Sequence, residues 1–166
     1  ALGSGCVDLP FLDSSSLGAE IQFGEVREFI EPALEVALAH AGLVCLETDL
    51  DPAGVRSLLE SLDHAAVAVC YDTGNSASLG HDMNQEFAAY GSRIHSVHIK
   101  DRLRNGGTVP LGTGATDFEA LFEQLENVSY RGPLILQAAR GDDYLEAARR
   151  SIEFVRKYVT SGGLRC

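Results

Sequence analysis

The sequence contains no run of about 18 apolar residues, the shortest stretch with which a helix crosses a membrane. Its first residues also lack the basic and apolar regions of a signal peptide. Its four cysteines, Cys6, Cys45, Cys70 and Cys166, include no C-x-x-C pair, and two of them stand inside apolar runs. Such positions are typical of buried reduced thiols, with a disulfide or a soft-metal site as the alternatives. We therefore expect a cytoplasmic protein.

Basic residues are also scarce. The 166 residues include 13 Lys and Arg against 24 Asp and Glu, which gives a net charge of −11. A chain this acidic is repelled by phosphate backbones and by anionic lipid unless its basic side chains are concentrated in one patch. The basic residues are scattered, apart from Lys100, Arg102 and Arg104. We expect no nucleic-acid partner and no membrane partner.

No linker, low-complexity segment or shift in composition divides the chain, and its length lies within the range of one domain. Apolar runs typical of buried strands alternate with segments of helical periodicity. We expect strands at 5–12, 43–50, 66–72, 93–101 and 132–140, and helices at 24–41, 51–62, 82–90, 117–126 and 142–159. Residues 74–80, GNSASLG, are expected to form a loop. Five strand–helix units in strict alternation predict a single α/β domain, residues 1–166, with parallel strands.

Polar groups recur at the ends of these strands. Side chains alternate between the two faces of a strand, and in four successive strands one face carries a polar group near the carboxyl end: Glu47, Asp72, His98 and Gln137. Functional groups of parallel α/β sheets gather at those ends. Two carboxylates, an imidazole and an amide oxygen would suit Mn²⁺, Mg²⁺ or Zn²⁺. Taken singly, each has a structural alternative as a helix cap, a solvated acid or a packed histidine. The same alternation places His95 toward the helices.

Several motifs, taken together, resemble one known superfamily. They are CLET at 45–48, YDTGN at 71–75, VHIKD at 97–101, VPLGTG at 109–114 followed by Asp117 and Phe118, and YRGPLIL at 130–136. They look like the sugar isomerase/epimerase superfamily with the xylose-isomerase-like TIM barrel. Within it, the likeness is to the L-ribulose-5-phosphate 3-epimerase and hexulose-6-phosphate isomerase group. The resemblance implies a divalent-metal-dependent isomerase or epimerase that moves a proton on a sugar or sugar phosphate through an enediolate.

The resemblance also implies a set of site residues. By motif, the metal ligands of that family fall on Glu47, Asp72 and His98, and the fourth ligand position falls on Gln137. Family members carry a glutamate there, and their two glutamates act as acid and base on opposite faces of the substrate. Glutamine offers a carbonyl oxygen to a metal but cannot exchange a proton. The resemblance thus implies Glu47 as the catalytic base, and a one-base isomerisation or another carbon-acid reaction is as open as an epimerisation.

Only part of a barrel is covered by the resemblance. A complete (β/α)8 TIM barrel has eight units and about 250 residues, whereas this chain resembles units four to eight. The expected fold class is a partial (β/α)8 barrel of five parallel β/α units, without the N-terminal three. An open sheet of this kind exposes two edges and a concave apolar interior. We expect a truncated reading frame whose product associates as a homo-oligomer.

The loop that follows the strand of His98 is a candidate for phosphate binding. Arg102 and Arg104 lie in it, at a position where barrel enzymes often hold phosphate. Gly112 and Gly114 come just before a helix, where backbone N–H groups attract anions. The alternative is a tight turn at 106–107 with arginines that face solvent.

Three further residues are candidates for substrate binding. Lys100 shares the face of His98 and is within reach of a substrate oxygen or a carboxylate. The resemblance assigns Asn75 to a substrate hydroxyl, although turn chemistry in DTGN also explains it. Arg140 comes just after Gln137 and is a candidate contact for the same anion.

Two other functions remain open. In the first, Gln137 and the missing units abolish the reaction. The chain is then a degenerate barrel without catalysis that binds a sugar or serves as an oligomeric scaffold. The superfamily also includes endonucleases that act on abasic DNA, but those need additional histidines and a basic groove. The net charge of −11 argues against the endonuclease.

Overall fold

The structure is a computed structural model, and it describes residues 5–18, 23–137, 139 and 143–162. Five parallel strands form one sheet in the order β1–β2–β3–β4–β7, and β5 pairs with β6 in a separate antiparallel hairpin. The strands are β1 (Cys6–Phe11), β2 (Leu43–Thr48), β3 (Val67–Asp72), β4 (Ile94–Ile99), β5 (Asp101–Arg102), β6 (Thr108–Val109) and β7 (Leu134–Leu136). The helices are α1 (Phe23–Ala39), α2 (Pro52–Leu62), α3 (Thr73–Leu79), α4 (Met83–Tyr90), α5 (Phe118–Asn127) and α6 (Tyr144–Gly162), with short 3-10 helices η1 (Asp13–Ser15) and η2 (Gly91–Arg93).

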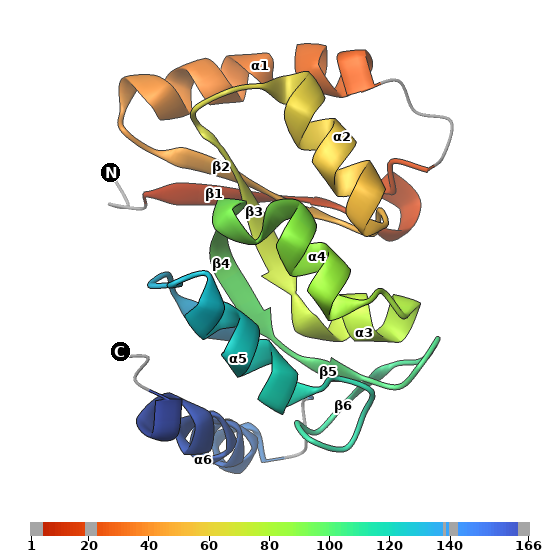
Figure 1. Cartoon of the computed structure of the whole chain (residues 1–166), viewed down its shortest axis with the longest axis vertical. Coiled ribbons are helices and arrows are strands. Elements are labelled where there is room, and N and C mark those ends of the chain that lie inside the picture. The colour runs from red at the N-terminus through yellow and green to blue at the C-terminus, as the bar shows by residue number, and fades with distance from the viewer. Residues whose placement is uncertain (1–4, 19–22, 138, 140–142, 163–166) are drawn as a thin grey trace.

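The helices follow one another along the sheet (Figure 1). Contacts join α1 to α2, α2 to α4, α4 to α5 and α5 to α6. One apolar cluster fills the space between these helices and the strands, to which the sheet contributes residues such as Leu46, Val69 and Ile99. A separate cluster of small residues lies on the other face of the sheet, and it consists of Cys45 on β2 and Ala68 and Cys70 on β3. The prediction of five parallel β/α units from a partial (β/α)8 barrel is confirmed.

The prediction of a loop at 74–80 is wrong, because residues 74–79 belong to helix α3. Asp72, the last residue of β3, caps the helix by accepting a hydrogen bond from the Asn75 backbone N–H at 2.7 Å. Gly80 ends it with a left-handed φ of 82°. Thr73, Asn75 and other residues of α3 are buried, so a side-chain cap and tertiary packing override the low helix propensity of a Gly-Asn-Ser sequence.

The prediction that His95 points toward the helices is also wrong. The pairing of β3 with β4 shifts register, since Val69 pairs with Ile94 and Cys70 with Ser96. The shift inserts one extra residue into β4 and breaks the alternation of its side chains. Ile94 therefore packs in the main apolar core, while His95 turns to the opposite face of the sheet, where its ring lies near Cys6 and Cys45. After the irregularity the alternation resumes, and His98 keeps its predicted face.

Within the described part of the chain, no helix combines the length and the apolar composition that a membrane span needs. Cys6, Cys45 and Cys70 are not joined by a disulfide in the described part of the chain, and Cys166 lies outside it. Their reduced state stays a prediction. The cytoplasmic location stays a prediction.

Asp101 organises the glycine-rich loop that follows β4. Its carboxylate is completely buried and accepts hydrogen bonds from the backbone N–H groups of Gly112, Gly114 and Thr116 at 2.9, 2.8 and 3.1 Å. A side chain on Gly114 would collide with this carboxylate, so the glycine is needed for the close approach. The loop is thereby folded back onto the end of β4, beside the carboxyl ends of the strands.

We predict that Asp101→Asn destabilises the fold by about 1–3 kcal/mol. An amide group in place of the carboxylate turns an N–H donor toward a backbone N–H donor and leaves a buried group without a partner. Urea unfolding measures the change. Asp63→Asn is the matched control, because Asp63 is exposed and adopts a left-handed conformation that asparagine tolerates. Equal stability of the two variants would contradict the role given to Asp101.

Candidate active site at the carboxyl ends of the strands

Three of the predicted metal ligands meet at one point. Glu47 at the end of β2, Asp72 at the end of β3 and His98 in β4 each offer an atom, and these atoms lie within 4.8 Å of one another. All three side chains are buried, with exposed fractions of 8%, 5% and 5%. The alternation of side chains along adjacent parallel strands places them on the same face, as the sequence indicated. Two carboxylates and an imidazole at this spacing make a cation-binding arrangement.

The two nitrogens of His98 face different groups. Nδ1 lies 3.0 Å from Nε2 of Gln137 and 3.6 Å from Oε2 of Glu47. Nε2 lies 3.3 Å from Sγ of Cys70 and 3.7 Å from Oδ2 of Asp8. Nδ1 therefore faces Gln137 and Glu47, whereas Nε2 faces Cys70 and Asp8.

Gln137 follows β7, the neighbour of the His98 strand β4, and its side chain contacts the His98 ring. Its backbone N–H donates to Ile99 at 3.0 Å, which continues the pairing of β7 with β4 by one residue. Unlike the other three side chains it is exposed. The structure thus brings Glu47, Asp72 and His98 together in a buried position and places Gln137 beside His98.

Burial and charge act strongly on Glu47. Burial, together with the nearby Asp72 carboxylate, raises the pKa of Glu47 to about 7, against the lowering effects of Lys100 and of a hydrogen bond from Asn75. A carboxyl group with a pKa near neutrality can both take up and give back a proton at physiological pH. This is the property that a general base for carbon–hydrogen bonds requires.

Asn75 links the cluster to the basic side chains. Its Nδ2 donates to Oε1 of Glu47 at 3.0 Å, and its Oδ1 accepts from Nζ of Lys100 at 3.3 Å and from Arg102 at 2.9 Å. Lys100 also lies 3.2 Å from Oδ2 of Asp72. Asn75 therefore holds the Glu47 carboxylate in place and lies between it and two cations.

The predicted phosphate loop is only partly assembled at this site. Arg102 is half-buried and is held by the Gly106 carbonyl at 2.9 Å. Arg104 is exposed, and its guanidinium covers Gly80 and donates to the Ala77 carbonyl at the end of α3. The N–H groups of Gly112 and Gly114, predicted to attract an anion, donate to Asp101 instead. Arg140 lies outside the described residues.

Two residues near His98 were missed by the sequence analysis. Asp8 in β1 and Cys70 in β3 approach the Nε2 side of the ring, and their ligand atoms and His98 lie within 4.8 Å of one another. Asp8 pairs in register with Cys45. Extending the alternation of side chains to the strand at 5–12 would have placed Asp8 on the same face as Cys6, and hence on the inner face of the sheet.

Comparisons with known proteins agree with this geometry. The profile of the family described as "Xylose isomerase-like TIM barrel" matches residues 2–158. The L-ribulose-5-phosphate 3-epimerase UlaE of Escherichia coli is 29% identical over 97 residues, which are 56% of this chain and 34% of that protein. The matched region is thus about a third of that relative's length.

Solved structures show the same fold. The xylose isomerase domain protein from Planctomyces limnophilus superposes with a TM-score of 0.79 at 22% identity, over 95% of this chain and 61% of that one. The IOLI protein with a binding zinc atom superposes with a TM-score of 0.74 at 18% identity, over 96% of this chain and 64% of that one. The chain therefore spans somewhat less than two thirds of each of these barrels.

The raised pKa of Glu47 predicts a pH dependence of stability. In the unfolded chain the group titrates near pH 4.5 and in the folded chain near 7. Its stabilising contribution is therefore complete below pH 4.5 and is lost as the pH rises to about 7. The free energy of unfolding of the wild type, relative to Glu47→Gln, should fall over this window by at most about 3 kcal/mol.

Urea unfolding of both proteins across pH 4.5–7.5, with a chelator present, measures this difference. Glu60→Gln is the control, because Glu60 is exposed on α2 and its loss should leave the pH profile unchanged. Parallel profiles for the wild type and Glu47→Gln would show that Glu47 titrates normally.

Proposed function

The chain belongs to the xylose isomerase-like TIM barrel family, and from this premise we propose that its strand-end cluster binds a divalent cation and isomerises or epimerises a sugar or sugar phosphate. The observation that carries the proposal is the meeting of Glu47, Asp72 and His98 within 4.8 Å. The names of an epimerase relative and of a zinc-bound neighbour support the substrate class and the cation.

The donor set fits a divalent cation. Asp72 raises the pKa of Glu47, which means that the two carboxylates repel each other at short range and would gain from a positive charge between them. Glu47, Asp72, Nδ1 of His98 and the carbonyl oxygen of Gln137 would hold the cation, and Mn²⁺, Mg²⁺ and Zn²⁺ all accept such ligands. A bound divalent cation would supply Lewis-acid polarisation of the substrate carbonyl.

Glu47 is the proposed base. Its carboxylate removes the proton from the carbon next to the substrate carbonyl, and the electron pair of the C–H bond moves onto the carbonyl oxygen to form the enediolate. The carboxylic acid returns the proton to the former carbonyl carbon while a hydroxyl proton passes between the two substrate oxygens, which isomerises the sugar. Return of the proton to the original carbon on the same face regenerates the substrate, so epimerisation needs a proton donor on the opposite face. Asn75 holds Oε1 of Glu47 through its 3.0 Å hydrogen bond and so orients the carboxylate. Because Gln137 cannot carry a proton, the same glutamate both takes and returns it.

Lys100, Arg102 and Asn75 are proposed to bind substrate oxygens. Lys100 and Arg102 both donate to Oδ1 of Asn75. Lys100 also contacts the carboxylate of Asp72 at the edge of the cluster. A phosphate or a row of hydroxyl groups suits this mixture of cations and an amide. We also propose that Arg104 and Arg140 bind the substrate, at the end of the molecule that lies away from the cation.

We further propose that residues 1–166 form one barrel domain and that copies of the chain associate. In the described structure β1 pairs along one edge with β2, and β7 along one edge with β4. Each of these strands therefore presents an edge that another strand can cover. No nucleic-acid partner is proposed, because of the net charge of −11.

Glu47→Gln is predicted to abolish exchange of the substrate α-hydrogen with solvent. The chain is incubated with Mn²⁺ and L-ribulose 5-phosphate in deuterated water, and deuterium incorporation is followed by NMR. The wild type should exchange, whereas the variant retains an acceptor for Asn75 but has no base. Glu60→Gln is the matched surface control.

Exchange at the wild-type rate in Glu47→Gln would exclude Glu47 as the base. No exchange in any of the proteins, together with no stabilisation of the wild type by Mn²⁺, would favour the alternative of a barrel without catalysis.

Gln137→Glu is predicted to tighten divalent-cation binding by about tenfold or more, because it adds a carboxylate to the cluster. Titration calorimetry with Mn²⁺ measures the affinity. Gln85→Glu adds the same charge on the exposed surface of α4 and serves as the control. An equal change in both variants would mean that net charge, and not ligation by residue 137, sets the affinity.

A further inference from the structure

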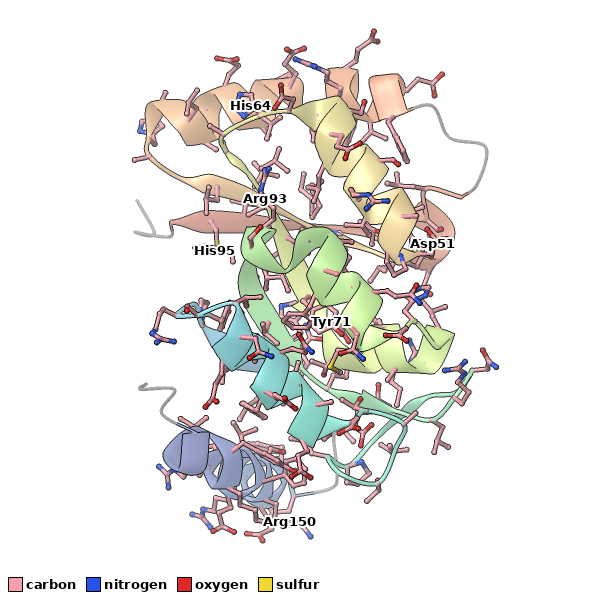
Figure 2. The ribbon with its side chains drawn as sticks, viewed as in Figure 1. Asp51, His64, Tyr71, Arg93, His95 and Arg150 are labelled. Atoms are coloured by element: carbon pink, nitrogen blue, oxygen red, sulfur yellow. The ribbon has the colours of Figure 1, made fainter. Side chains whose placement is uncertain are left out.

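A second group of metal-ligand side chains lies away from the carboxyl ends of the strands. Cys6 begins β1, Cys45 lies inside β2, and His95 is the second residue of β4. In Figure 2, His95 lies at the left of the view and Asp51, which follows the carboxyl end of β2, lies at the right, near the opposite end of the strands. The two sulfur atoms and a ring nitrogen lie within 4.8 Å of one another. We propose that Cys6, Cys45 and His95 bind a thiophilic divalent cation of the Zn²⁺ type, independently of the cluster around Glu47.

The fold brings these three residues together for specific reasons. Cys6 pairs with Leu43, so Cys45 lies two residues further along β2 on the same face, and the Cys45 thiol is in hydrogen-bond contact with Cys6. The register shift in β4 turns His95 to this face. Ala68 on the intervening strand β3 is small, which lets the imidazole reach toward Cys45 across it.

The chemistry of the group suits zinc. Two thiolates and one imidazole are ligands that Zn²⁺ prefers, and a tetrahedral site with the usual bond lengths spaces them about 3.5–3.8 Å apart. Shifts of up to about 1 Å by rotation of the side chains would bring the three atoms to this spacing. Cys45 is completely buried, whereas Cys6 and His95 are half-buried, so the group has a closed side and an open side.

Asp8 is a candidate for a fourth ligand through Oδ1, since its Oδ2 lies toward Nε2 of His98. Its carboxylate is in hydrogen-bond contact with the Cys45 thiol. Among the described residues its Oδ1 atom is buried and has no partner that meets hydrogen-bond geometry. A cation between the two thiols and the imidazole would give this oxygen a partner, with the oxygen as a ligand. Such a site would tie β1 and β2 to β4 across the inner face of the sheet.

Cobalt provides a direct test, because Co²⁺ bound to thiolate shows a sulfur-to-metal charge-transfer band that carboxylate, amide and imidazole ligands do not produce. The full chain is kept reduced and titrated with Co²⁺. We expect the band to saturate at one Co²⁺ per chain and to disappear when Zn²⁺ is added. Cys6→Ser and His95→Gln, at half-buried positions, should each weaken Co²⁺ binding by about tenfold or more. Circular dichroism establishes that the variants are folded.

Cys70→Ser is the matched control. Cys70 is the third described cysteine and lies 3.3 Å from Nε2 of His98, so its loss should leave the cobalt band unchanged. Absence of the band in the wild type, or a band that is lost in Cys70→Ser but kept in Cys6→Ser, would overturn the proposal. So would a Cys6–Cys45 disulfide found by mass spectrometry after the thiols of the freshly purified chain are blocked.

Discussion

The close approach of two buried carboxylates, Glu47 and Asp72, is the constraint around which the rest of the site is arranged. Like charges in a poorly solvated position are costly, and two contacts reduce the cost: Asn75 donates to Glu47, and Lys100 lies beside Asp72. The penalty that remains, chiefly from burial, raises the pKa of Glu47 to about 7, so that a bound proton relieves the repulsion near neutral pH. The helix that carries Asn75 is itself capped by Asp72. The same carboxylate thus helps to create the cluster and to position the amide that stabilises it.

The register shift between β3 and β4 has a comparable influence on the inner face of the sheet. It lets one strand present His95 toward Cys6 and Cys45, and then His98 toward Glu47 and Asp72. Without the extra residue, His95 would lie among the helices and Ile94 on the inner face. A single irregularity therefore gives β4 two histidines on the same face, each beside a different pair of potential ligands.

Much of this arrangement follows from the sequence alone, and the failures have identifiable causes. Glu47 and Asp72 were placed correctly because β2 and the end of β3 alternate regularly. His95 was misplaced because a register shift depends on pairing with another strand and leaves no local signal. Helix α3 was missed because its Gly-Asn-Ser composition favours a turn, whereas the Asp72 cap and burial decide the outcome. The amides of Gly112 and Gly114 were assigned to an anion because the sequence does not show that Asp101 folds back onto them.

The unequal burial of the four proposed ligands links cation binding to assembly. Glu47, Asp72 and His98 come from strands that are paired on both sides, so their positions are set by the sheet. Gln137 follows β7, a strand of three residues that pairs with β4 along one edge in the described structure, and its side chain is exposed. A segment or a second copy that covered the other edge of β7 would restrict Gln137 and lower the entropy lost when it binds a cation. In the proposed enzyme, the fourth ligand is therefore held most firmly when the barrel edge is covered.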